Sequence, residues 1–324
     1  MNILLTGATG FVGGHVADRL VARGDRLTAL VRSAARAQRL ADAGVVLVLG
    51  DLDDHAALRR AAEGQDAVCH MAALTGAVDE AEFLHANRDG TANLIRAVEE
   101  IAPNARFVYV SSMAAGGPAR HGHPRVDGEP DAPVTMYGRS KLAGEVATRA
   151  ARLPWVILRP PAVYGPRDRD NFLVLFKAAR GGIVPIFGDG TMELSAVHVG
   201  DLADAIVRSV DASRVLGRSF YVNHPEVVTS RTLVTTIATV EGKRVRIVPL
   251  PEFAARAALG AIGGIAALLR RKTILRYDKA NEFYQEAWTA DPSAFVAATG
   301  WTPAFALAPG LADTFRWYQE AGWL

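Results

Sequence analysis

Short apolar runs alternate with longer amphipathic segments through the first half of the chain, and this alternation restricts the fold more than any other feature. Six runs are apolar almost throughout and predict strands: residues 2–6, 26–31, 45–49, 66–71, 106–110 and 154–159. Helical periodicity covers the segments between them: residues 11–23, 34–42, 54–62, 79–101 and 136–152. Strands without a polar face need cover on both sides, as in α/β proteins. The alternation therefore predicts a doubly wound parallel sheet with helices on both faces.

This alternation ends after Arg159. Turn-forming clusters such as "RPPAVYGPRDRDN" and "FGDG" interrupt the second half, where strands and helices no longer alternate cleanly. We expect a doubly wound (Rossmann) domain over residues 1–160, to which residues 196–222 return. Most of residues 161–324 are expected to form a smaller, irregular lobe against the carboxyl edge of the sheet, where such folds bind ligands.

Composition and charge exclude several classes of function. The chain has 324 residues, of which 50% are hydrophobic, so it can bury a large core. Its 36 basic and 34 acidic residues are dispersed, which argues against nucleic acid as a partner. Cys69 is the only cysteine, which rules out an internal disulfide and a thiolate metal cluster. We expect a cytoplasmic protein whose first residues, "MNILLTGATGFVGG", belong to the fold and not to a signal peptide.

One apolar segment raises the question of membrane contact. Residues 257–269, "AALGAIGGIAALL", contain no charged side chain. Crossing a bilayer takes about 20 residues, so no membrane span is expected here. The segment also lacks the polar face that interfacial helices carry. We therefore interpret it as a buried or substrate-covering helix, with an interfacial anchor as the less favoured alternative.

A glycine-rich turn follows the first predicted strand directly. Gly7, Gly10 and Gly13 lie in "TGATGFVG", between that strand and the first predicted helix. Glycines in this place permit a tight turn, and they let backbone N–H groups at a helix N-terminus approach a pyrophosphate. Three glycines alone often mark only a turn, but their position after a buried strand predicts a dinucleotide site.

The end of the second predicted strand indicates which dinucleotide binds. An NAD site usually has Asp or Glu here for the ribose 2′-hydroxyl, whereas this chain has Arg32. A guanidinium suits a 2′-phosphate, which favours NADP, with NAD as the alternative and a solvated surface charge as the non-functional explanation. After the third predicted strand, Asp51 and Leu52 are expected beside the adenine, and Asp53 is expected to cap a helix.

The stretch "TMYGRSKLAGE" places Tyr137 and Lys141 four residues apart at the start of a predicted helix. Such residues share one helical face, so the phenol and the ammonium converge on the same space. A phenol has a pKa of about 10, and a nearby ammonium that stabilises the phenolate makes it a better acid–base catalyst at neutral pH. A surface tyrosine beside a solvated lysine is the alternative explanation for the pair by itself.

Several further motifs carry a family resemblance. In chain order they are "TGATGFVGG", "GDL", "HMAA", "NRDGTAN", "VYVSS", "YGRSK", "LRPPAVYGP" and "VHVGDLADA". Their order and spacing resemble those of the extended short-chain dehydrogenases/reductases, the NAD(P)-dependent epimerase/dehydratase superfamily. The branch that looks most similar contains dihydroflavonol reductases and 3β-hydroxysteroid dehydrogenases. The resemblance covers most of the chain.

The resemblance implies roles for particular residues. It implies that Tyr137 transfers a proton to or from the substrate oxygen, that Lys141 supports it and holds the cofactor ribose, and that Ser112 hydrogen-bonds the reacting oxygen, with Ser111 as the alternative. The same resemblance extends the cofactor site to Thr9, Phe11, Val12, Met71, Ala72, Ala73, Asn87, Pro160 and Val163. No metal is implied, and a homodimer is usual for the family.

Three functions fit these observations. The first is an NADP-dependent oxidoreductase that interconverts a ketone and a secondary alcohol on a small, hydrophobic molecule. The second is a nucleotide-sugar epimerase or dehydratase with bound NAD, for which Arg167, Arg169, Asn171 and Arg276 are candidate phosphate ligands. The third is a non-catalytic dinucleotide sensor, which would have no need of the Ser112, Tyr137 and Lys141 set. We favour the first because "MAAGGP" follows Ser112 where nucleotide-sugar enzymes usually have "VYG".

Overall fold

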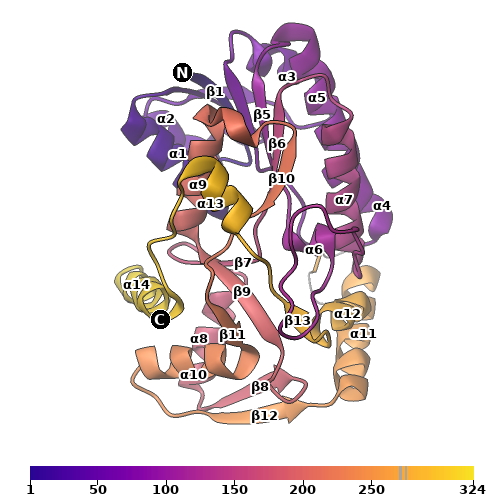
Figure 1. Cartoon of the computed structure of the whole chain (residues 1–324), viewed down its shortest axis with the longest axis vertical. Helices are drawn as coiled ribbons and strands as arrows, with labels where there is room; N and C mark the ends of the chain where they lie inside the picture. The colour runs from indigo at the N-terminus through magenta and orange to yellow at the C-terminus, as the bar shows by residue number, and fades with distance from the viewer. Residues whose placement is uncertain (270–271, 274–275) are drawn as a thin grey trace.

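A parallel sheet organises the computed structural model, which describes residues 1–269, 272–273 and 276–324 (Figure 1). This seven-stranded sheet has the order β10-β6-β5-β4-β1-β2-β3. The strands are β1 (Asn2–Thr6), β2 (Arg26–Val31), β3 (Val46–Leu49), β4 (Ala67–His70), β5 (Arg106–Val110), β6 (Trp155–Arg159) and β10 (Arg218–Tyr221). All are parallel to their neighbours, and the order reverses at β1, so the doubly wound α/β prediction is confirmed.

Helices cover both faces of this sheet. One face packs on α1 (Phe11–Arg23) and α9 (Val199–Asp211), and the other on α3 (His55–Ala62), α5 (Gly90–Ile101) and α7 (Met136–Arg149). Each face has its own apolar core, because the strand side chains alternate between the two sides. Shorter helices lie in the connections: α2 (Gln38–Asp42), α4 (Glu80–Leu84) and α6 (Met113–Gly116).

The second half of the chain forms a lobe below the carboxyl edge of the sheet (Figure 1). Its strands are short: β7 (Ala162–Tyr164), β8 (Ile183–Phe187), β9 (Glu193–His198), β11 (Val227–Thr229), β12 (Arg246–Leu250) and β13 (Ala287–Trp288). Its helices are α8 (Phe172–Arg180), α10 (Ser230–Val240), α11 (Glu252–Leu268), α12 (Ala280–Phe283) and α14 (Leu307–Glu320). β7, β11 and β13 all pair with β9, and β12 pairs with β8.

The chain returns twice from the lobe to the large sheet. The first return supplies α9 and β10. The second return is α13 (Ser293–Thr299) and the residues after it, where the buried Phe295 and Trp301 join the core on the α1 side. The sequence did not indicate this second return, because residues 293–301 lie more than 70 positions beyond β10, the last strand of that sheet.

Two expectations about burial need correction. Strand β3 is apolar, but it lies at the sheet edge, and Val46 and Leu49 are 61% and 55% exposed. The apolar segment 257–269 is not a buried helix: only one side of α11 packs on the protein, while Ile265 is 59% and Leu268 is 84% exposed. Apolar composition predicts a need for cover, but it does not say which neighbour provides it.

Candidate active site

The glycine turn between β1 and α1 is built so that only glycine fits at two positions. Gly7 has a φ of +76°, and a Cβ on it would lie 2.7 Å from the backbone nitrogen of Ala72. A Cβ on Gly13 would lie 2.1 Å from the carbonyl oxygen of Gly7. The first glycine thus allows the turn and the last lets the helix pack against it. Both serve to bring the start of α1 close to the sheet edge.

The N-terminus of α1 is open to a ligand. Its N-cap is Gly10, no side chain caps the helix, and no acidic residue lies in its first turn. Thr9 and Gly10 are exposed, while Phe11 and Val12 are half-buried. Uncapped N–H groups at a helix N-terminus favour an anion. This arrangement fits a pyrophosphate, as the sequence predicted for these residues.

Arg32 stands at the carboxyl end of the neighbouring strand β2 and is exposed. Within the described part of the chain, its guanidinium has no ion-pair partner. Asp51, also exposed, follows β3 and accepts hydrogen bonds from the backbone of Asp53 and Asp54. The helix cap is Asp54, which accepts from the backbone of Ala57, so the expectation for Asp53 is wrong by one residue.

The loop after β4 lies against the glycine turn. The backbone nitrogen of Ala72 donates to the Thr6 hydroxyl, and that hydroxyl is also 2.6 Å from Nδ1 of the buried His70. Burial lowers the pKa of His70 to about 3, so its ring is neutral. Met71 and Ala72 are half-buried and Ala73 is exposed. His70 therefore holds this loop in place and is engaged on both ring nitrogens, the second by Thr91 at 2.9 Å.

Asn87 links this loop to α7. It lies in a π-helical turn, His85–Asp89, and is buried. Its amide accepts from the backbone nitrogen of Leu74 and donates to the Ser140 hydroxyl at 2.9 Å, which donates in turn to the carbonyl of Tyr137. The cofactor role expected for Asn87 is untested, but the residue fixes the position of Tyr137 relative to the loop. Ser140, between Tyr137 and Lys141, was not singled out in the sequence.

Ser112 and Tyr137 meet at the carboxyl edge of the sheet. Ser112 follows β5 and caps α6, where its hydroxyl accepts from the backbone of Ala114 at 3.1 Å. The same side chain lies close enough to the phenol of Tyr137 to lower its pKa. Ser111 instead donates to the buried carboxylate of Glu145 at 2.6 Å. Of the two serines, therefore, Ser112 is the one beside the tyrosine.

Lys141 lies one helical turn beyond Tyr137 and is 1% exposed. Its ammonium donates to the carbonyl of Val110 at 2.9 Å and lies 4.4 Å from the centre of the Tyr109 ring. Burial lowers the pKa of Lys141 to about 7, against the opposing effect of Glu145. Burying a cation with so few partners is unfavourable, which is typical of functional sites.

The effect of Lys141 on Tyr137 differs from the expectation. Burial raises the pKa of Tyr137 to about 12, and the nearby side chain of Ser112 lowers it only in part. The ammonium is turned toward the strand carbonyl, so it does not offset this increase. Tyr137 is therefore a neutral phenol at physiological pH, which suits it to donate a proton.

A buried ion cluster that the sequence did not reveal anchors α7. Glu145, fully buried, accepts from Arg159 at 2.6 and 2.9 Å and from Arg149 at 2.6 Å. Asp131 adds a second carboxylate to Arg159 at 2.7 Å. Because Arg159 ends β6, the cluster fixes α7 to the sheet. In the sequence, only the four-residue spacing from Lys141 to Glu145 indicated that Glu145 shares a helical face with Tyr137 and Lys141.

The remaining candidate residues lie near the same edge. Pro160 is buried, and its carbonyl accepts from the backbone of Met113, next to Ser112. Val163 is half-buried on β7, and Leu52 is half-buried after β3. They are thus distributed along the carboxyl ends of the strands, and their cofactor roles stay predictions.

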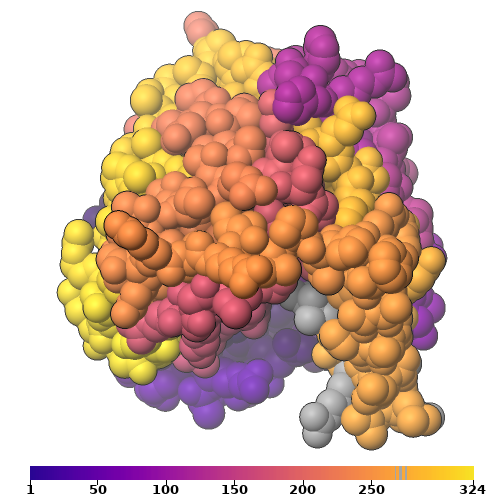
Figure 2. Space-filling model, turned by 90° about the horizontal axis from the view of Figure 1, so that it is seen from below, coloured from indigo at the N-terminus to yellow at the C-terminus, as the bar shows by residue number. Residues whose placement is uncertain are grey.

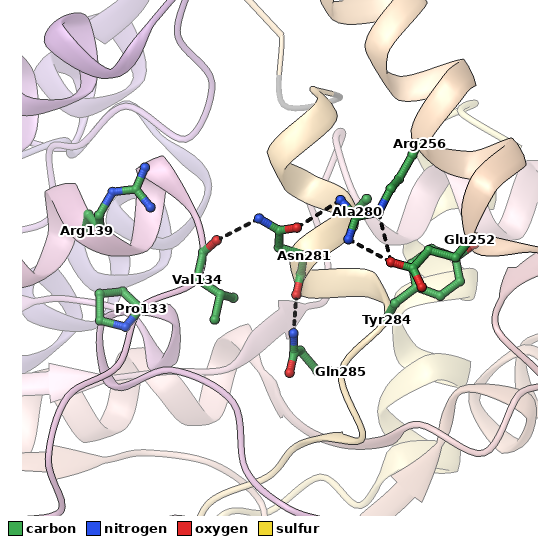
Figure 3. A pocket seen from close by; sticks show the side chains of 9 residues that line it. All are labelled: Pro133, Val134, Arg139, Glu252, Arg256, Ala280, Asn281, Tyr284 and Gln285. Carbon is green, nitrogen blue, oxygen red and sulfur yellow. Dashed lines mark hydrogen bonds and ion pairs between the residues drawn. The ribbon is translucent and has the colours of Figure 1, made fainter.

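A pocket of about 410 Å³ lies beside the N-terminal end of α7 (Figure 3). Asn281 is near its centre, donates to the carbonyl of Val134 and accepts from Arg256 at 3.0 Å. Arg256 is also held by Glu252 at 2.8 Å. Glu252 and Arg256 both belong to α11. This helix is therefore linked through Asn281 to Val134, in the segment that leads into Tyr137. The pocket's other residues are Pro133, Arg139, Ala280, Tyr284 and Gln285.

This geometry agrees with comparisons to known proteins. A family model described as the NAD dependent epimerase/dehydratase family matches residues 3–222, from β1 to the end of the large sheet. The chain belongs to this family. The match spans the glycine turn, Ser112, Tyr137 and Lys141. The chain is accordingly an NAD(P)-dependent oxidoreductase of the extended short-chain dehydrogenase/reductase type.

Individual family members resemble the chain over nearly its whole length. The ceramide reductase of Caulobacter vibrioides is 32% identical over 326 residues, covering 99% of the chain and 96% of the relative. The UDP-glucose 4-epimerase of Vibrio cholerae is 29% identical and covers 77% and 79%. The structure of MoeE5 in complex with UDP-glucuronic acid and NAD is 26% identical, with a TM-score of 0.80 and coverage of 99% and 100%. Both reductases and nucleotide-sugar enzymes are therefore relatives.

The length and hydropathy of the helices bear on membrane contact by α11. Among the described residues, none of the helices combines the length and the hydropathy needed to cross a bilayer. In the same part of the chain, no group of three or more His, Cys, Asp or Glu side chains is arranged to hold a metal. Cys69 is buried, which raises its pKa to about 12 and makes it unreactive.

Proposed function

We propose that the protein is an NADP-dependent reductase that converts a ketone of a hydrophobic small molecule to a secondary alcohol, with the reverse oxidation accessible from the same groups. The observation that carries the proposal is the placement of Ser112, at the start of α6, beside the neutral phenol of Tyr137 at the start of α7. Two hydroxyl donors directed at one oxygen are what a carbonyl acceptor requires.

In this proposal each of these residues has one task. Ser112 and Tyr137 donate hydrogen bonds to the carbonyl oxygen and polarise it. The hydride for the carbonyl carbon would come from NADPH when it is bound. As negative charge develops on the oxygen, Tyr137 gives up its phenolic proton, and the product is the neutral alcohol. Lys141, whose ammonium is turned toward the carbonyl of Val110, keeps the task that the family resemblance implies, which is to hold the cofactor ribose.

The phosphate end of the cofactor would lie on α1. The uncapped N-terminus of this helix and the close packing of Gly7 and Gly13 fit the pyrophosphate. Arg32 is exposed and unpaired among the described residues, so its guanidinium is available for a 2′-phosphate. This supports NADP over NAD.

The nucleotide-sugar alternative has support from the MoeE5 complex with UDP-glucuronic acid and NAD. The arginines that would serve it are engaged elsewhere. Arg167 pairs with Asp18 at 2.8 Å, and Arg276 donates to the carbonyls of Ala77 and Val78. Arg169 stacks on Trp323 at 4.5 Å. Three cations already held by protein groups favour a substrate without a diphosphate, and the full-length similarity to a ceramide reductase agrees with a lipid-like ketone.

One experiment separates the two functions. The purified chain is incubated with NADPH and a long-chain alkyl ketone, a short-chain alkyl ketone or UDP-glucose, and loss of nicotinamide absorbance and thermal stabilisation are recorded. We expect turnover of the long-chain ketone with kcat/KM at least ~10-fold above the short-chain one, because each buried methylene favours binding. Stabilisation by UDP-glucose without ketone turnover would reject the reductase assignment.

The variant Arg32→Asp is the control for the cofactor. We expect its preference for NADPH over NADH to fall by about tenfold or more, since a carboxylate repels the 2′-phosphate. Arg36→Asp, on an exposed residue of the next turn, should leave the ratio within about threefold. Equal ratios in wild type and Arg32→Asp would remove the NADP assignment.

A further inference from the structure

The outer side of α11 is apolar from end to end. At 100° per residue, the exposed positions from Phe253 to Leu268 fall on one half of the helix. None of these exposed residues has a polar side chain. Between Phe253 and Leu268 they are Ala257, Ala258, Ala261, Ile262, Gly264 and Ile265. A solvent-facing helix side normally carries the charged residues, so this distribution is inverted.

The opposite side of α11 packs on the protein. Ala255 and Leu259 are buried, and the helix contacts α12 and the turn at Tyr277–Lys279. Figure 2 shows the helix at the edge of the molecule, standing out from the body of the lobe. The absence of a polar face, which argued against an interfacial helix in the sequence, is explained because the protein itself supplies the polar side.

The segment that follows Glu252 is rich in basic residues, although Arg256 pairs with Glu252 and Lys272 pairs with Glu82. Residues 253–277 contain five basic residues and no Asp or Glu. One of the five, Arg256, lies 5.4 Å from the ring of Tyr277, which is 58% exposed. Basic residues and an interfacial aromatic ring beside an apolar surface are the features that bind proteins to anionic bilayers.

From these observations we infer that α11 is a membrane-docking helix, which lies in the surface of an anionic lipid bilayer with Ile262, Ile265 and Leu268 among the acyl chains. The helix extends about 25 Å, given 1.5 Å per residue, so it lies along the surface. Its first turn supplies Glu252 and Arg256 to the pocket in Figure 3. The docked helix therefore also lines the pocket next to the segment leading to Tyr137.

Vesicle flotation with the full chain tests this inference. The probes are vesicles of phosphatidylcholine alone and of phosphatidylcholine mixed with phosphatidylglycerol, at low and high salt. We expect wild type to float with the anionic vesicles, and to bind at least ~10-fold more weakly to the neutral ones and at high salt. Ile265→Glu should weaken binding to the anionic vesicles by at least ~10-fold.

A matched variant controls for the new charge. Val174 on α8 is 57% exposed, close to the 59% of Ile265, and lies outside α11. Val174→Glu should bind vesicles like wild type. Equal binding by Ile265→Glu and Val174→Glu, or no flotation of wild type, would overturn the inference. A wild-type dimer that Ile265→Glu splits, without vesicle binding by either, would assign the face to a second copy.

The result does not depend on the reaction. Flotation needs no turnover, so an inactive chain still tests α11. If the reductase proposal holds, Ile265→Glu should keep wild-type kcat/KM for a soluble short-chain ketone and lose at least ~10-fold for a long-chain ketone supplied in anionic vesicles. Loss with both substrates would show damage to the catalytic site instead of the docking face.

Discussion

At the residue scale, one position along the chain separates a structural serine from one at the active site. Ser111 is the last buried residue before the sheet edge and donates to Glu145, whereas Ser112 turns toward Tyr137. Successive residues of an extended segment point to opposite sides, so adjacent serines cannot both face the site. This geometry favours Ser112 over Ser111, and the catalytic role of Ser112 stays a prediction.

Replacing Tyr137 with Phe tests the proton donor. The ring keeps its contact with Phe83 at 6.1 Å between centroids, so packing is retained while the hydroxyl is lost. We expect turnover to fall by at least ~100-fold and cofactor affinity to change by less than about threefold, because proton transfer and not binding is removed. Steady-state kinetics and cofactor titration check this. Near-normal turnover would remove Tyr137 from the mechanism.

Replacing Lys141 with Met tests the cost of its burial. The pKa of Lys141 is depressed from its ordinary value to about 7, so the unfolded chain binds this proton more tightly than the folded one. The free-energy cost of burying the charged ammonium is fully present below pH 7. It declines as the pH rises toward the pKa of this lysine in the unfolded chain. We expect Lys141→Met to be more stable than wild type by about 1 kcal/mol or more at pH 7, with little activity.

The pH dependence provides the control for that prediction. At pH 9 the stability advantage of Lys141→Met should be smaller than at pH 7 by ~1 kcal/mol or more. Denaturant unfolding at both values measures it. An advantage that is the same at pH 7 and pH 9 would mean that packing, and not the ammonium, causes the difference.

At the element scale, α7 is the part on which the site depends. It carries Tyr137 and Lys141 on one face and is tied to the rest of the fold at both ends of the motif. Asn87 reaches it through Ser140, and Glu145 binds it to Arg159 on β6. The position of Tyr137 relative to Ser112 needs such support, because small displacements are costly in catalysis.

Glu145→Gln tests this anchor. The substitution keeps the side-chain volume but leaves the buried Arg159 with Asp131 as its remaining carboxylate. We expect a loss of about 3 kcal/mol in the free energy of unfolding. Glu80→Gln is the matched control, because Glu80 also pairs with an arginine, Arg139, but at the surface. The free energy of unfolding of Glu80→Gln should fall by less than about 1 kcal/mol. Similar losses in the two variants would contradict a special role for Glu145.

At the scale of the whole molecule, the C-terminal residues join the lobe to the large sheet. Trp301 is fully buried in the α1-side core, 5.6 Å from Phe295 between ring centroids, and its indole donates to the carbonyl of Asp201. The carboxylate of Asp201 also accepts from the backbone of Ala304 and Phe305. Residues far beyond the Rossmann half thus complete its core.

Trp301→Ala tests this closure. Removing a buried indole from a packed core should lower the free energy of unfolding by about 3 to 5 kcal/mol. Because both parts share this core, we expect one unfolding transition, shifted equally in far-UV circular dichroism and tryptophan fluorescence. Trp323 lies near the C-terminus and is only partly buried, so Trp323→Ala should lower the free energy of unfolding less than Trp301→Ala. Two separated transitions in wild type would contradict the closure.

The sequence by itself determined the parallel sheet, the glycine turn and the placement of Tyr137 and Lys141 on one face of a helix. Each of these follows from spacing within a few residues: the alternation of strand and helix, a turn that tolerates only glycine, and one turn of helix. The family follows as well, because the same local patterns recur in order along the chain.

Only the tertiary structure decided which groups are already engaged and which surfaces stay uncovered. Arg276 meets the carbonyls of residues 77 and 78 almost 200 positions away, and Asn87 meets Ser140 across 53 positions. The exposure of α11 is the same kind of fact. Local sequence fixes the hydrophobicity and period of a segment, whereas its partners depend on contacts between distant residues that no local pattern encodes.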